Sequence, residues 1–220
     1  MLEQHGLTRA PSQTYSVGMR TIVLTGFEPF DRAAANPSWD AVRLVAERWN
    51  RPEHLVTACL PVAFGAAGAT IRALVAEHPS DVVVATGLAD GRSTVSLERV
   101  AINVDDARIP DNDGAQPIDV PIASEGPAAY FSTLPIKAAT DAVLALGIPA
   151  AVSQTAGTYV CNHVFYEVMR VVRPGVVAGF VHVPAADVVS VEDAARALEA
   201  VLVEALTRTV DLVISGGAVS

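Results

Sequence analysis

The chain has 220 residues, of which 51% are hydrophobic and 18% are charged, and its formal net charge is −9. This length suits one large domain with its own core. The excess of acidic residues disfavours a nucleic-acid partner, because phosphate neutralisation needs clustered Lys and Arg. No stretch of about twenty residues is apolar enough to span a bilayer. We therefore expect a soluble protein that acts on small molecules or peptides, not on nucleic acids or at a membrane.

The cysteines and the N-terminal residues bear on the cell compartment. Two cysteines, Cys59 and Cys161, are too few for a disulfide framework, and the first eighteen residues lack the apolar core of a signal peptide. We expect the cytoplasm, where thiols stay reduced. Because residues 1–18 are polar and without period, they predict a disordered extension, followed by a single α/β domain over 19–220.

From residue 21 onward, apolar β-branched runs alternate with Ala-rich stretches of helical period. The runs are continuously apolar, which is typical of strands that are covered by helices on both faces of a sheet. Ser190 and Asp193 resemble the pair that begins a helix. In chain order, we expect strands at 21–27, 54–62, 81–88, 150–155 and 176–184, and helices at 65–78, 134–148, 159–172 and 190–210.

The segment 93–127 breaks this rhythm, since it is rich in Pro, Asp and Gly and contains only short β-like pieces. It predicts a hairpin or excursion with long loops, where function often collects. Several motifs are missing: G-x-G-x-x-G, G-x-x-x-x-G-K-[ST], G-x-S-x-G and H-E-x-x-H. We therefore expect no nucleotide, no metal and no other cofactor.

Cys161 lies near the start of a predicted helix, where the positive end of the helix dipole favours a thiolate and would lower the pKa of the thiol. The alternative is a small buried hydrophobic residue. His163 is a poor base for this thiol, because residues two apart on a helix point about 200° apart. His163 and Glu167 are four apart and could instead form a surface hydrogen bond.

A better base is His182, the single polar ring in the strand 176–184 and near its carboxyl end, where sites of α/β sheets assemble. A buried histidine bonded to a backbone carbonyl is the alternative. A third group would orient the imidazole. Glu98, the one acid in an apolar segment, is a choice, although the sequence alone favours a surface ion pair of Glu98 with Arg92 or Arg99.

Four segments of the chain carry a further signal: "TGFEPFDRAAANPSW", "GLADGRSTVSLERVAINVDDARIPDNDGAQPIDVPI", "SQTAGTYVCNHVFYEVM" and "GFVHVP". In this order and register they resemble the pyroglutamyl peptidase I family, from about residue 19 to residue 184. The resemblance implies a cysteine peptidase that removes an N-terminal pyroglutamyl residue from peptides. It also implies a single-domain, three-layer α/β/α sandwich with a mostly parallel, mixed central sheet, and a homotetramer.

Matched position by position, the resemblance implies a catalytic triad of Cys161 as nucleophile, His182 as base and Glu98 as the orienting acid. It implies a substrate pocket in which Arg108 lies near the oxyanion. The implied pocket residues are Phe27, Phe30, Asn36, Leu88, Arg108, Tyr159 and Val160.

Three positions depart from the family. Tyr159 stands where many members have Phe, Leu88 where some have Gln, and Asp90 where Gly is frequent. These departures keep two alternatives open: a lactam- or peptide-binding homologue without turnover, and a cysteine hydrolase that acts on another amide.

Overall fold

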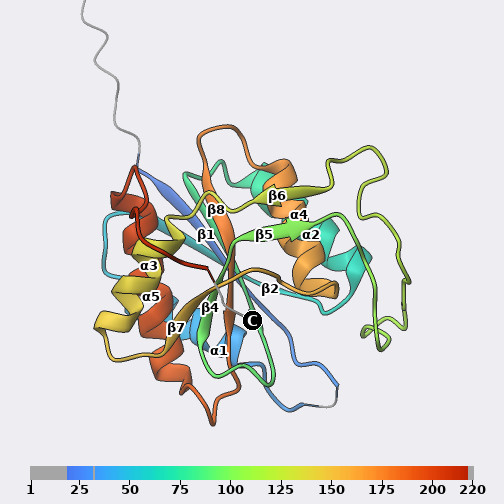
Figure 1. Ribbon diagram of the computed structural model, residues 1–220, viewed down its shortest axis with the longest axis horizontal. Helices are drawn as coiled ribbons and strands as arrows, with labels where there is room; N and C mark the ends of the chain where they lie inside the picture. The colour runs from blue at the N-terminus through green and yellow to red at the C-terminus, as the bar shows by residue number, and fades with distance from the viewer. Residues whose placement is uncertain (1–18, 32, 218–220) are drawn as a thin grey trace, which may run out of the picture.

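A computed structural model describes residues 19–31 and 33–217 (Figure 1). The extension expected over 1–18 lies outside the described residues. Within them, no helix has both the length and the apolarity needed to cross a membrane. The elements in chain order are β1 (Thr21–Phe27), α1 (Pro37–Arg48), β2 (His54–Leu60), α2 (Phe64–Glu77), β3 (Val82–Leu88), β4 (Val95–Glu98), β5 (Val100–Ile102), β6 (Ala129–Phe131), α3 (Ile136–Ala145), β7 (Ala150–Ser153), α4 (Val160–Val171), β8 (Val177–Val183) and α5 (Val191–Thr207).

Six strands form the central sheet in the order β2-β1-β3-β8-β4-β7. The pairs β1–β2, β1–β3 and β3–β8 are parallel, β4 runs antiparallel to β8, and β7 is parallel to β4. The expected mostly parallel, mixed sheet is thus confirmed. The segment 93–127, which we expect to form an excursion, differs from this expectation at its start, because its first strand, β4, belongs to the central sheet. The next strand, β5, pairs with β6 in a separate two-stranded sheet.

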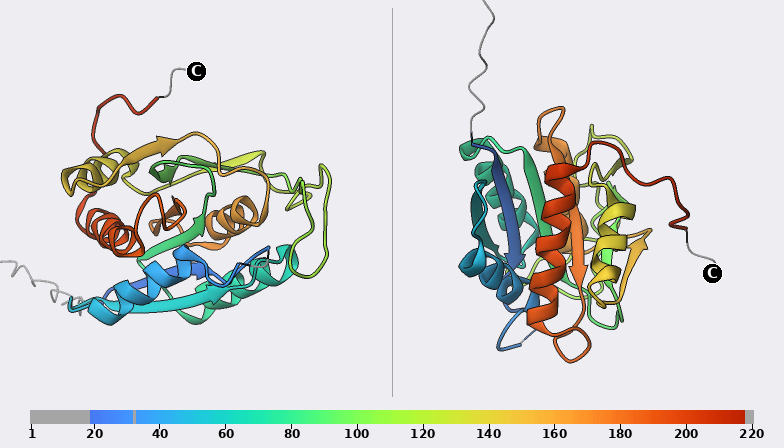
Figure 2. Two further views of the ribbon diagram at one scale, coloured as in Figure 1. Left: turned by 90° about the horizontal axis from the view of Figure 1, so that it is seen from below. Right: turned by 90° about the vertical axis from the view of Figure 1, so that its left-hand side faces the viewer.

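Alternate residues of each strand face two separate cores, which makes the expected three layers (Figure 2). On one face, Leu24, Val84 and Val181 pack with helices α1, α3 and α5. On the other face, Val83 and Phe180 pack with α2 and α4. Even-numbered residues of β8 therefore point toward α4. In β4, Val95 and Leu97 belong to the core beside α1, α3 and α5, so the residues that alternate with them point toward α4.

The helix α1 is absent from our expectations, although its start carries a local pattern. Asn36 precedes Pro37, and its Oδ1 accepts a hydrogen bond from the Ser38 backbone N–H at 3.1 Å. An Asn cap followed by Pro at the first helical position is a common helix start. At the other end of the chain, the expected pair holds, since the Ser190 hydroxyl accepts from the Asp193 N–H at 3.0 Å.

Gly26 lets the end of β1 lie directly against α1. A Cβ built on Gly26 would be 2.7 Å from both the Cα and the N of Trp39. These neighbours are backbone atoms, which cannot turn aside as a flexible side chain can. The contact fixes how the chain turns from β1 toward α1, and thereby where Phe27 lies.

We expect Gly26→Ala to lower the free energy of unfolding by about 1–3 kcal/mol, because the added methyl overpacks a backbone contact. The matched control is Gly65→Ala, since a Cβ at Gly65 in α2 meets nothing within 4 Å. Alanine there is expected to stabilise by up to ~1 kcal/mol. Urea unfolding of both variants measures the difference, and equal midpoints would contradict the close approach.

Candidate active site

Cys161 is the second residue of α4, as the sequence predicts. Tyr159 is the residue before the helix, and its side chain makes no capping hydrogen bond. The His163 N–H donates to the Tyr159 carbonyl at 3.1 Å, which is the first bond of the helical ladder. The N–H groups of Val160, Cys161 and Asn162 come before this first donor, so they have no acceptor within the helix. They form the positive end of α4 beside the sulfur.

His182 and Glu98 form a buried hydrogen-bonded pair on the face of the sheet that α4 covers. His182 Nδ1 lies 2.7 Å from Glu98 Oε1, and the two residues are 4% and 0% exposed. An ionised carboxylate only accepts, so Nδ1 carries the hydrogen and Nε2 is left as a free base. The strand register explains the contact: Ser96 pairs with His182, so Glu98 reaches diagonally across from β4 to β8.

Arg92 is a third member of this cluster. Its Nη1 lies 2.6 Å from the same oxygen of Glu98, and its Nη2 donates to the Thr155 carbonyl at 2.8 Å. The alternative prediction for Glu98, an ion pair at the surface, is therefore correct in naming Arg92 as the partner. It is wrong in placing the pair at the surface. It is wrong about Arg99, whose Nε donates to Gln154 instead. Arg92 thus gives the buried Glu98 a partner of opposite charge.

Gly87 shows where the sulfur lies relative to the His182 strand. A Cβ on Gly87 would be 2.8 Å from Cys161 Sγ and 3.0 Å from Phe180 Cζ. Gly87 pairs with His182 in the β3–β8 register, so both residues point to the same face. The Phe180 and His182 rings lie 4.8 Å apart between centroids. The missing side chain of Gly87 thus makes room for the thiol on the face where His182 and Glu98 meet.

Burial dominates the protonation of these groups. It raises the pKa of the Cys161 thiol to about 12, and the charge of Glu98 adds to this rise while Arg92 opposes it. The expectation of a lowered pKa for this thiol is therefore wrong, because loss of solvent disfavours the charged thiolate. Burial also lowers the pKa of His182 from 6.5, partly offset by its hydrogen bond to Glu98. At neutral pH the site holds a neutral thiol and a neutral imidazole.

A cavity of about 360 Å³ opens beside Cys161. Every residue that the sequence assigns to the pocket lines it, together with five that the assignment leaves out. The expected residues are Phe27, Phe30, Asn36, Leu88, Arg108, Tyr159 and Val160, and the additional ones are Val62, Asp90, Asp106, Ile109 and Thr158.

The walls of this cavity are tied to one another. The Tyr159 hydroxyl, which departs from the Phe of many family members, donates to the Pro110 carbonyl at 3.0 Å. The Tyr159 ring also packs against Phe30, with centroids 5.5 Å apart. Asp111 Oδ2 accepts from the Phe64 N–H at 2.9 Å, so the same loop caps helix α2. The loop after β5 is therefore anchored to the starts of two helices.

His163 does not take part in the cluster around Cys161. Its Nδ1 lies 2.8 Å from Asp105 Oδ2, and both residues are buried. The expected surface hydrogen bond to Glu167 is wrong, because the buried Glu167 pairs with Arg72 and Arg170. The prediction that His163 is remote from the thiol chemistry is consistent with this separate partner.

Sequence reasoning also misses Asn162, which follows the candidate nucleophile and is fully buried. Its side chain accepts from the Ile102 N–H at 3.0 Å and donates to the carbonyls of Ile102 and Val104 at 2.9 and 3.0 Å. These bonds fix the first turn of α4 against the segment that continues from β4. An Asn inside an apolar helix was a usable signal, because a buried amide must find partners.

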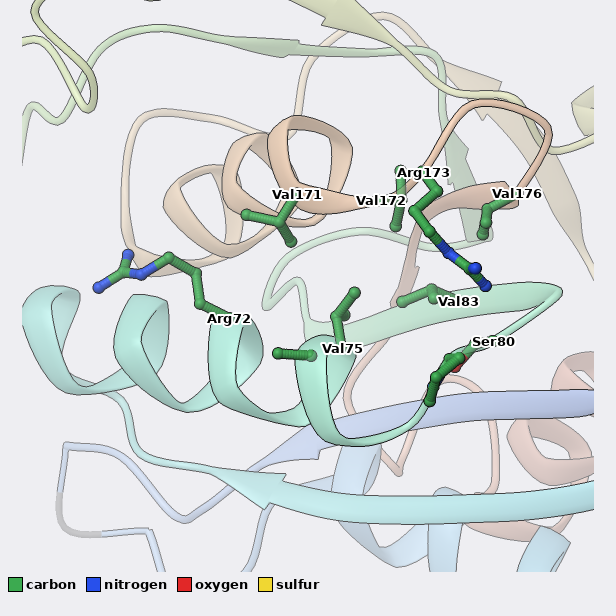
Figure 3. Close-up of a pocket in the computed structure, with 10 residues that line it drawn as sticks. Arg72, Val75, Ser80, Val83, Val171, Val172, Arg173 and Val176 are labelled. Carbon is green, nitrogen blue, oxygen red and sulfur yellow. The ribbon is translucent and has the colours of Figure 1, made fainter.

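A second cavity, of about 390 Å³, lies at the opposite end of β3 and β8, beside the last turns of α2 and α4 (Figure 3). Half of its ten lining residues are valines, and Arg72 and Arg173 lie at its sides. It contains no cysteine, histidine or carboxylate, so it does not compete as a catalytic site. Across residues 19–31 and 33–217, no group of three or more His, Cys, Asp or Glu could hold a metal ion.

Comparison with known proteins gives consistent results. The sequence model of the family described as pyroglutamyl peptidase matches residues 20–218. A pyrrolidone-carboxylate peptidase of Clavibacter michiganensis is 59% identical over 168 residues, covering 76% of this chain and 79% of the relative. One from Pectobacterium carotovorum is 45% identical over 217 residues, covering 91% and 99%.

Solved structures agree in fold. The pyroglutamyl peptidase I of Bacillus amyloliquefaciens superposes with a TM-score of 0.84 at 37% identity, covering 90% of this chain and 100% of that chain. The pyrrolidone carboxyl peptidase of Thermococcus litoralis gives 0.82 at 32% identity, with the same coverage of 90% and 100%.

The raised pKa of Cys161 predicts slow alkylation. In the free protein we expect iodoacetamide to modify Cys161 more slowly than the exposed Cys59 at pH 7, with a rate that keeps climbing above pH 9, because only the thiolate reacts. Mass spectrometry of the two peptides from one sample measures both rates, so Cys59 is the internal control. Faster labelling of Cys161 at pH 6 would mean that the helix end does dominate.

Proposed function

The chain belongs to the pyroglutamyl peptidase family, and on this premise we propose that it hydrolyses the amide bond after an N-terminal pyroglutamyl residue of peptides as a cysteine peptidase. In this proposal Cys161 is the nucleophile, His182 the base and Glu98 the acid that orients the base. One observation carries it: the buried His182–Glu98 pair, 2.7 Å between Nδ1 and Oε1, faces the same side of the sheet as the Cys161 sulfur.

The first half of the reaction forms a thioester. His182 Nε2 takes the thiol proton as Cys161 Sγ attacks the pyroglutamyl carbonyl carbon. The carbonyl oxygen becomes an oxyanion, which the N–H groups at the start of α4, together with Arg108, stabilise. The tetrahedral intermediate then expels the amine of the next residue, which receives the proton from the imidazolium. Glu98 stabilises that imidazolium while it lasts.

The second half returns the enzyme to its resting state. Neutral His182 takes a proton from water, and the hydroxide oxygen bonds to the thioester carbon. The intermediate collapses, the C–S bond breaks, and the imidazolium returns the proton to the sulfur. Free pyroglutamate leaves, and the thiol and imidazole are again neutral. The resting state with two neutral groups agrees with the raised pKa of Cys161 and the lowered pKa of His182.

Specificity for the lactam follows from the cavity walls. The pyroglutamyl ring is compact and uncharged, and Phe27, Phe30, Tyr159 and Val160 offer it apolar contacts. An open N-terminal ammonium or a glutamate carboxylate would be desolvated there without a partner, at a cost of several kcal/mol. The pocket therefore selects by rejecting charge.

The remaining features are proposed by analogy with the family. They are substrates that carry an N-terminal pyroglutamate, a single peptidase domain over residues 19–220, a homotetrameric assembly and a cytoplasmic location. A lactam- or peptide-binding homologue without turnover is the alternative, since three departures from the family, Leu88, Asp90 and Tyr159, all line the cavity. Turnover decides between the two functions.

We expect the protein to release the chromophore from pyroglutamyl p-nitroanilide under reducing conditions, and Cys161→Ser and His182→Ala each to lose about 10³-fold or more in kcat. His163→Ala is the control, assayed below its own melting temperature, because it removes a buried histidine that binds Asp105 and not the sulfur. We expect it to retain turnover. An inactive wild-type protein would favour the binding homologue, and equal loss in all three variants would refute the assigned roles.

Activity should depend on a neutral His182, so it is retained above the imidazole pKa and lost as the pH falls through it. Burial lowers the pKa of His182 below 6.5, and Glu98 partly offsets this lowering. Glu98→Gln should therefore lower kcat and move the acid limb of kcat/KM to still lower pH. The exposed Glu125→Gln is the matched control, with an unmoved limb. Ring NMR titration of His182 checks the pKa directly, and an upward shift in Glu98→Gln would contradict the assignment.

A further inference from the structure

The cavity beside Cys161 carries charges that a neutral lactam does not need. Its lining includes two carboxylates and one guanidinium, from Asp90, Asp106 and Arg108. All three residues are exposed to solvent. A pyroglutamyl ring cannot form an ion pair with any of them. Because the proposed function places Arg108 at the oxyanion, the two carboxylates are available to the part of the substrate that lies beyond the scissile bond.

Asp90 lies in the turn that follows β3. The turn is held by the Ala89 N–H, which donates to the Val183 carbonyl at 2.9 Å, and it continues through Gly91 at a φ of +82°. Gly87 is three residues earlier, in β3, and a Cβ built on it would lie 2.8 Å from the Cys161 sulfur. Among the described residues, the Asp90 carboxylate has no hydrogen-bond or ion-pair partner. The turn thus places this carboxylate at the wall of the cavity that Cys161 also lines.

Asp106 is held equally firmly. Its backbone N–H donates to the Thr158 carbonyl at 2.9 Å, and the Thr158 hydroxyl donates to the Asp106 carbonyl at 2.7 Å. Because Ala107 is buried, its neighbours Asp106 and Arg108 both point outward. In the described part of the chain, neither of these two side chains has an ion-pair partner, and they do not pair with each other. The nearby Arg92 is already bound to Glu98.

We propose that Asp90 and Asp106 make the enzyme prefer pyroglutamyl peptides in which the next residue is cationic, Lys or Arg. The inference rests on the proposed function. The pyroglutamyl carbonyl must lie at Cys161, so the next residue begins there and extends along the remaining, charged wall. If Arg108 faces the oxyanion, two carboxylates remain for that residue. Two carboxylates in one cleft create a negative potential, which attracts a cationic side chain.

The test compares pyroglutamyl-lysine amide with its near-isosteric neutral counterpart, pyroglutamyl-norleucine amide, and with pyroglutamyl-glutamate amide. The amides remove the terminal carboxylate, which would otherwise add its own charge. In the wild-type protein we expect kcat/KM to be highest for the lysine amide, lower for the norleucine amide and lowest for the glutamate amide. Each of the two aspartates that contributes should change kcat/KM about two- to fivefold. The lysine-to-norleucine ratio should shrink in 0.5 M NaCl because salt screens exposed charges.

Asp90→Asn and Asp106→Asn should each reduce the lysine-to-norleucine ratio, and the double variant should bring it close to one. The matched control is Asp141→Asn, an exposed aspartate of α3 on the other face of the sheet, which changes net charge equally and should keep the ratio. A wild-type lysine-to-norleucine ratio of one would overturn the proposed preference. So would Asp90 and Asp106 variants that keep the wild-type ratio. In both cases turnover of the pyroglutamyl amides would still support the proposed function. If no pyroglutamyl amide or anilide is cleaved, the proposed function itself fails.

Discussion

The buried carboxylate of Glu98 is the constraint on which the rest of the site depends. A carboxylate with 0% exposure must be paired, and a single oxygen, Oε1, serves both Arg92 and His182. The strand register allows this contact, because Glu98 lies two residues beyond the Ser96–His182 pair and can reach back to the ring. β4 and β7 run opposite to the other four strands of the sheet, and in the proposed reaction this arrangement brings the acid to the base.

The position of the nucleophile depends on close contacts of a different kind. The sulfur of Cys161 fits against β3 because Gly87 has no side chain, and Asn162 ties the same turn of α4 to Ile102 and Val104. Burial of the thiol raises its pKa to about 12. In the proposed mechanism, the start of α4 therefore acts by offering N–H groups to the oxyanion rather than by holding a resting thiolate. In that mechanism the proton moves to His182 as the bond to carbon forms.

The parts that the sequence predicts well are those set by local period. Continuous apolar runs predict β1, β3 and β8, and the start of α4 places Cys161 at a helix end. Helical geometry also separates the thiol from His163 without any knowledge of the fold. The failures are tertiary. The burial of Glu98, the bond of Asp105 to His163, and the burial that raises the thiol pKa all depend on residues far apart in the chain. The missed α1 is different, since its Asn36–Pro37 start was visible locally.

The distribution of charge in the cavity connects the chemistry to the choice of substrate. In the proposed reaction Cys161 and His182 are nearest the reacting carbon, and both are neutral at rest. The charge of Glu98 beside them is offset by that of Arg92. A neutral ring can therefore enter without leaving a charge unpaired. Among the described residues that line the cavity, the charged ones without an ion-pair partner are the exposed Asp90, Asp106 and Arg108. The loop with Asp106 and Arg108 is anchored at Thr158 and at the start of α2, so its backbone holds these two residues at the cavity wall. One cavity can thus exclude charge at the ring and select it one residue further along the peptide.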